Sequence, residues 1–149
     1  MTEILPLRDL LPELRQWNKG RSVSPLNYVY AIARSSDALA YCALFWPQFV
    51  RFEGYVLRED FSLETLRSWE AAGRYSRKSI EAAVNYLGLG DLFACEEETD
   101  LVYQRIVKLG EVLSEAYRAK LALDFPDTAF DVTVIVEEGE YALTFSQLE

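Results

Sequence analysis

The residues of this chain that could do chemistry are mostly carboxylates, and they are concentrated in its last third. Residues 96–149 contain 13 Asp and Glu but only 4 Lys and Arg, whereas residues 1–95 contain 11 of each kind. The whole formal charge of −9 therefore belongs to the last third of the chain. Carboxylates at this density repel nucleic acid and attract cations or basic protein surfaces.

Two acidic stretches are candidates for a cation site. "DFPDTAFD" places Asp124, Asp127 and Asp131 within eight residues, and "EEETD" offers four carboxylates from Glu96 onward. Calcium loops of the EF-hand type alternate their ligands around a central glycine and end in a glutamate. Neither stretch has that arrangement, so we expect helix caps and solvated turns there, with no bound metal and no cofactor.

Other catalytic chemistry has little support in the sequence. The chain contains no histidine, which excludes Ser-His-Asp and Cys-His machinery. Cys42 and Cys95 lie among apolar residues, where we expect both thiols to be buried and unreactive. The segments "GLGD" and "RYSRKS" lack the surroundings of a phosphate loop or a nucleic-acid site. We therefore predict a protein that is not an enzyme and does not bind nucleic acid, although an enzyme built on a pair of carboxylates stays open.

Composition also indicates a compartment. Two cysteines do not make a disulfide framework, and the N-terminus has no basic segment followed by a long apolar run. No stretch reaches the roughly 18 apolar residues of a membrane span. We expect a cytoplasmic protein with no membrane partner.

The helices are predicted from caps and periodicity. We expect helices over residues 9–18, from Pro25 to the proline at position 47 with a break or a new cap at "RSSD", and in two short pieces that begin at Ser62 and Ser76 and stop at Gly73 and Gly88. The longest helix should run over residues 99–123, where apolar residues recur at helical spacing. Gly110, inside this helix, predicts close packing or a bend.

Two β-hairpins are predicted, over residues 49–57 and 131–146. In the first, a Glu53-Gly54 loop would place Phe52 opposite Tyr55 and Val50 opposite Leu57, so we interpret its aromatic residues as core rather than as an exposed recognition patch. In the second, apolar residues alternate on both sides of "EEGE". The apolar face of this second hairpin would consist of Val132, Val134, Val136, Tyr141, Leu143 and Phe145.

The expected fold class is therefore α+β: a single, mainly helical domain of 149 residues. An isolated hairpin is marginal in water, so the second hairpin should either lie on the helices or extend one small antiparallel sheet with the first.

The acidic residues lie mostly at turns and at the ends of elements, where a partner could reach them. The candidate partner-binding residues are Glu96, Glu97, Glu98, Asp124, Asp127, Asp131, Glu137, Glu138 and Glu140. The hairpin tip and the start of the long helix are treated as two competing sites. In size, acidity and α+β makeup the chain is similar to the immunity proteins that neutralise bacterial toxins.

We therefore expect it to bind and neutralise a basic protein partner, with a toxin-like nuclease as the most concrete case. Two alternatives stay open. The chain could be an adaptor or assembly subunit whose acidity serves only solubility, or a carboxylate-based enzyme.

Overall fold

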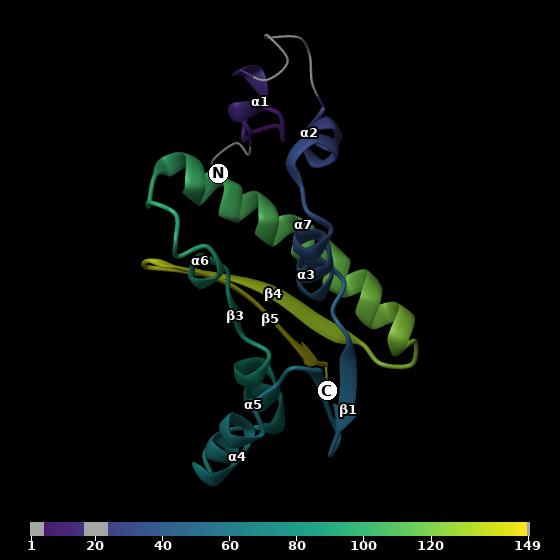
Figure 1. Ribbon diagram of the computed structural model, residues 1–149. Helices are drawn as coiled ribbons and strands as arrows, with labels where there is room; N and C mark the ends of the chain where they lie inside the picture. Colours follow the sequence, from purple (N-terminus) through teal and green to yellow (C-terminus); the bar gives the residue numbers. More distant parts are fainter. Residues whose placement is uncertain (1–4, 17–23, 149) are drawn as a thin grey trace.

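The computed structural model describes residues 5–16 and 24–148, and it has a mainly helical α+β fold (Figure 1). The elements follow one another along the chain as α1 (Glu13–Gln16), α2 (Pro25–Ile32), α3 (Ser35–Phe45), β1 (Phe49–Phe52), β2 (Tyr55–Arg58), α4 (Leu63–Ala71), α5 (Arg77–Val84), β3 (Leu87–Gly88), α6 (Leu89–Leu92), α7 (Asp100–Asp124), β4 (Phe130–Glu137) and β5 (Glu140–Gln147). Within these described residues, no helix is both long enough and apolar enough to cross a bilayer.

Both predicted hairpins are confirmed, with the predicted register in the first. Strand β1 pairs with β2 so that Phe52 lies opposite Tyr55 and Val50 opposite Leu57. Strand β4 pairs with β5 along its whole length, from Phe130–Gln147 to Glu137–Glu140. Gly54 and Gly139 adopt φ angles of 87° and 76° in the two turns, a left-handed conformation that favours glycine.

The two hairpins lie in separate sheets. β1 and β2 form a two-stranded sheet, whereas the second sheet has the order β3-β5-β4. The backbone groups of Val56 that could have paired with another strand are bound instead by α5. Its Glu81 Oε2 accepts from Val56 N at 2.8 Å, and its Asn85 Nδ2 donates to Val56 O at 2.9 Å. The single shared sheet that the sequence left open is therefore not formed.

The same two side chains bind strand β5. Asn85 Nδ2 donates to Phe145 O at 3.3 Å, and the Gln147 backbone N–H donates to the Glu81 carboxylate. Glu81 and Asn85 are only 2% and 1% exposed. Helix α5 thus inserts polar side chains between the facing edges of β2 and β5 and satisfies backbone groups that burial would otherwise leave unpaired.

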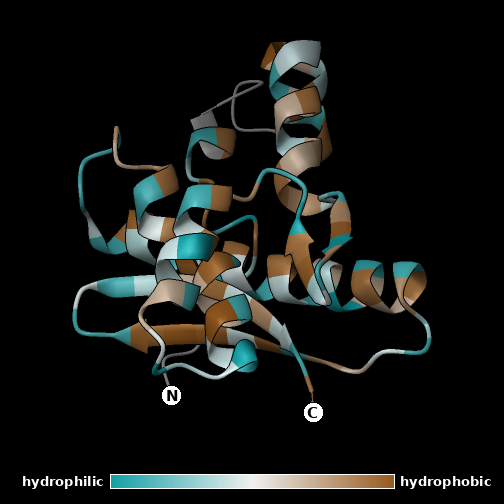
Figure 2. Cartoon of the chain, turned by 90° about the horizontal axis from the view of Figure 1, so that it is seen from below, coloured by the Kyte–Doolittle hydropathy of each residue, from teal (hydrophilic) through white to brown (hydrophobic). Residues whose placement is uncertain are grey.

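Helices α7 and α5 cover opposite faces of the β4–β5 hairpin (Figure 1). On the α7 side, Leu113, Tyr117 and Leu121 pack in one cluster with apolar residues of the strands. On the α5 side, Thr144 is buried, and its hydroxyl donates to Ala82 O. Figure 2 shows the resulting layering, with hydrophobic strands between the helices and hydrophilic connecting turns.

The aromatic-rich β1–β2 hairpin lies between two core clusters, as predicted for core residues. Val56 belongs to the cluster under α7, while Tyr55 and Leu57 belong to a second cluster with α4 and α5. Phe52 is only half-buried, against Phe61. Trp46 stays 45% exposed, with the Lys120 ammonium 5.7 Å from its ring centroid.

The helix predictions hold best where caps are strong. Thr99 caps α7 by accepting from Val102 N at 3.2 Å, and the helix starts within one residue of the predicted position. The 25–46 segment is broken between α2 and α3. The 9–18 helix is wrong for its described part, which is helical only over Glu13–Gln16; positions 17 and 18 lie outside the described residues. Helix α5 ends before Asn85, not at Gly88, because Asn85 turns to the strands and residues 87–88 pair with β5.

Helices α2 and α3 leave most of their side chains exposed. Neither α2 nor α3 contains a buried residue among those described, although both are strongly apolar. Cys42 and Cys95 are also exposed, so the expectation that both thiols are buried is wrong. Cys42 lies on a helix that touches the core with one side only, where apolar neighbours in sequence do not bury a residue, and Cys95 lies in the turn after α6.

The joint between α5 and the strands yields a stability prediction. In the Glu81→Ala variant, the buried N–H groups of Val56 and Gln147 lose their acceptor, so the free energy of unfolding should fall by at least about 3 kcal/mol. Urea denaturation measures this change. Glu59→Ala, at an exposed position of the same hairpin, should stay within about 0.5 kcal/mol of the parent. Equal effects of the two substitutions would show that Glu81 does not hold the strands together.

Candidate functional site

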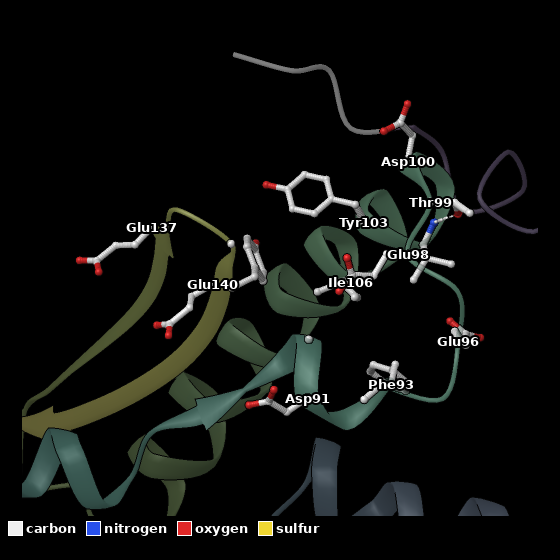
Figure 3. Close-up of a pocket in the computed structure, with 15 residues that line it drawn as sticks. Asp91, Phe93, Glu96, Glu98, Thr99, Asp100, Tyr103, Ile106, Glu137 and Glu140 are labelled. Atoms are coloured by element: carbon white, nitrogen blue, oxygen red, sulfur yellow. Dashed lines mark hydrogen bonds between the residues drawn. The ribbon is translucent and has the colours of Figure 1, made fainter.

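A cleft of about 560 Å³ lies between the tip of the β4–β5 hairpin, α6 and the start of α7 (Figure 3). Six carboxylates line it, and no Lys or Arg does so among the described residues. These acidic residues are Asp91, Glu96, Glu98, Asp100, Glu137 and Glu140. The cleft therefore presents a negative potential without an internal counter-charge.

On one wall of the cleft, the acidic residues belong to the beginning of α7. Thr99 caps the helix, and Glu96 and Glu98 immediately precede it. Asp100 occupies the first turn, where the helix dipole favours a negative charge. The helix dipole thus offsets part of the electrostatic repulsion among the carboxylates of this wall.

The opposite wall is the hairpin tip, where the charges are less well accommodated. Glu137 and Glu140 are directly opposite each other across the two strands, an arrangement in which like charges destabilise a hairpin. The Tyr86 hydroxyl donates to Glu140 Oε2 at 3.1 Å and offsets part of this repulsion. The tip thus keeps two carboxylates against a local energetic cost.

Aromatic and aliphatic side chains form the surface between the two walls. Figure 3 shows Tyr103 and Ile106 projecting from α7 between the hairpin and the loop before the helix. The ring of Tyr141, from β5, lies edge-on to Tyr103 with centroids 6.4 Å apart. Its hydroxyl donates to Val107 O at 3.3 Å. An apolar surface between acidic walls suits a long side chain with a cationic end.

Tyr141 and Tyr86 remain neutral near physiological pH. Burial raises the pKa of the Tyr141 phenol, and the nearby Glu111 carboxylate raises it further. Partial burial likewise raises the pKa of Tyr86, and the hydrogen bond to Glu140 adds to this effect. The charge of the cleft therefore comes from its carboxylates alone.

The structure brings the two competing sequence-predicted sites together. Glu96 and Glu98 line the cleft from one side, and Glu137 and Glu140 line it from the other. Glu97 and Glu138 are exposed beside them but do not line the cleft. What the sequence presents as alternatives is one surface in three dimensions.

The remaining three sequence-predicted residues lie elsewhere. The Asp124 carboxylate accepts from Lys120 Nζ at 2.6 Å, and Asp131 lies 3.7 Å from Lys78 Nζ. Asp127 is exposed in the turn between α7 and β4. None of the three lines the cleft, and two of them already have a cationic neighbour.

Sequence reasoning missed several residues of the cleft. Asp91 carries no local signal, because its place depends on the packing of α6 against the hairpin. Val102 and Ile106 belong to the predicted apolar stripe of the long helix, yet here they line the cleft. One feature of the sequence could have indicated the cleft: the apolar residues at helical spacing continue to the acidic N-terminal end of the long helix.

The acidic side chains surround the cleft rather than converging on one point (Figure 3). Among residues 5–16 and 24–148, no group of three or more His, Cys, Asp or Glu side chains is placed to hold a metal ion. The arrangement therefore fits several separate cationic groups better than one divalent ion.

No protein-family model, curated protein or solved structure matches this chain. The geometry and charge of the cleft therefore carry the functional argument.

Gly110 packs closely against Tyr141, a residue that lines the cleft, and this contact leads to a testable prediction. A Cβ atom at this position would lie 2.5 Å from Tyr141 Cε1, so alanine would push the tyrosine ring out of place. Helix propensity alone favours alanine by about 1 kcal/mol. We expect Gly110→Ala nevertheless to destabilise the protein by about 1–3 kcal/mol, as measured by thermal or urea unfolding.

The control is Gly110→Ala in a Tyr141→Leu background. There the clash is absent, and alanine should be neutral or stabilising. A stabilising effect in the parent background would contradict the close packing of Gly110 on Tyr141.

Proposed function

We propose that this chain binds a basic protein partner and neutralises it, and that the acidic cleft is the binding surface. The observation that carries the proposal is that six carboxylates from three separate segments line one cleft, with no basic residue beside them among the residues that the structure describes. None of the six forms an ion pair with another residue in the described part of the chain. Their charges are thus available to a partner.

The cleft suits arginine and lysine side chains. Their cationic ends would meet the carboxylates of the walls, while their aliphatic stems would pack on Ile106 and Tyr103. Tyr103 is 53% exposed, which leaves its ring open to an arginine guanidinium. Several such contacts around one cleft favour a protein surface rather than a single small cation.

A toxin-like nuclease is the most concrete partner of this kind. An enzyme that cleaves nucleic acid needs a basic groove for the phosphate backbone. An acidic protein seated on that groove would exclude the substrate, which is the mode of neutralisation we propose. Association would be steered by charge and would slow as ionic strength rises, while dissociation would depend more on buried apolar contacts.

The proposal predicts that both walls of the cleft contribute to one binding site. Glu137→Lys/Glu140→Lys and Glu96→Lys/Glu98→Lys should each weaken binding by at least an order of magnitude, about 1.4 kcal/mol. The partner for this measurement is to be identified among basic proteins that co-purify with the chain or that neighbouring reading frames encode. Calorimetric titration at low and at high salt gives the affinities, and growth of cells that express both proteins reports neutralisation.

The matched control is Glu115→Lys/Asp127→Lys, which changes the net charge equally at exposed positions outside the cleft. It should retain most of the affinity. An equal loss in the control would assign the effect to net charge alone. Unchanged affinity in both cleft variants would instead favour an adaptor whose acidity serves only solubility.

A further inference from the structure

Helices α2 and α3 follow one another along the chain (Figure 1), and each exposes an apolar stripe. Each stripe has the spacing i, i+3, i+4, i+7 that places side chains on one face of a helix. The stripes are Leu26, Val29, Tyr30 and Ala33 in and just after α2, and Leu39, Cys42, Ala43 and Trp46 in and just after α3. All eight residues are exposed, with Tyr30 at 83% and Leu39 at 72%.

Apart from Trp46, whose ring lies near Lys120 of α7, the residues of these stripes do not lie on the sides of the helices that contact the rest of the molecule. Tyr28 and Tyr41 line a smaller groove shared with α1 and α7, and Leu44 and Phe45 pack against the core. A helix that uses one side for the core normally presents polar residues on the other. Here the outer side is apolar as well, which marks a surface that another molecule covers.

The charges of this segment indicate which molecule that is. Residues 24–46 carry one cation, Arg34, and one anion, Asp37, so the segment is neutral in a chain of formal charge −9. Both residues are exposed, Arg34 at the break between α2 and α3 and Asp37 in the first turn of α3, and neither has an ion pair within the described chain. Two copies of so acidic a protein meet with least repulsion at a neutral face.

We propose that this face joins two copies of the chain into a symmetric dimer. In a two-fold contact, residue i meets j and j meets i. An axis through the α2–α3 break would pack α2 of one copy on α3 of the other and would pair Arg34 with Asp37 twice. A membrane surface fits less well, because helices that lie on membranes carry several Lys and Arg residues on their polar face. The dimer does not depend on the proposed function.

Sedimentation velocity over a wide range of protein concentration tests the dimer. The parent protein should dimerise, and Tyr30→Glu and Leu39→Glu should each raise the dimer dissociation constant by at least about tenfold. Leu123→Glu, at a residue that is 68% exposed near the end of α7, should leave it unchanged. Circular dichroism establishes that each variant remains folded.

Charge exchange tests the two-fold pairing. Arg34→Asp and Asp37→Arg should each weaken their own dimer, whereas an equal mixture of the two variants should form a heterodimer as tight as the parent. A mixture no tighter than either variant alone would overturn the pairing. A parent protein that is monomeric at every concentration would overturn the dimer, and its flotation with phosphatidylcholine vesicles through Tyr30 and Leu39 would assign the face to membranes.

Discussion

Two side chains one turn apart, Glu81 on α5 and Asn85 at its C-cap, hold together strands that do not pair with each other. Glu81 and Asn85 each bind the backbone of both β2 and β5. Without them, the buried edges of two small sheets would face each other with unsatisfied amides and carbonyls, and neither sheet would be stable on its own. Because this joint fixes one end of β5, the strand leads in a defined direction to the acidic tip. The cleft thus depends on a contact at the far end of the same strand.

The elements that the sequence predicts well are those with local signals. The cap at Thr99 and the turn glycines Gly54 and Gly139 act within a few residues, so both hairpins and the long helix follow from pattern alone. Glu81 shows the opposite case. A glutamate in a short helix is ordinarily solvated. Glu81 is buried because its carboxylate accepts hydrogen bonds from the backbone N–H groups of Val56 and Gln147, which are 25 and 66 residues away in the sequence. Nothing near it in the sequence carries that information.

The cleft and the N-terminal helices show two further limits of sequence reasoning. The sequence shows that carboxylates are concentrated at turns. Whether the hairpin tip lies near the loop before α7 depends on how β5 packs along α7. The same composition could not separate free acids from Asp124, which Lys120 binds. In α2 and α3 the apolar periodicity is real, yet the helices leave it exposed. Apolar periodicity identifies the face of a helix that is suited to burial. It does not tell whether the core of the same chain or another molecule buries that face.

Strand β4 lies at the edge of its sheet, so one row of its backbone groups has no strand partner in the described chain. Arg118 binds Val132 O on this strand at 3.1 Å, and Asp131 and Glu137 place charges near its two ends. Charged edges discourage a strand from adding to the sheet of another molecule. The acidity of the last third therefore has a second effect, because charge at this edge disfavours the strand-to-strand addition by which fibrils grow.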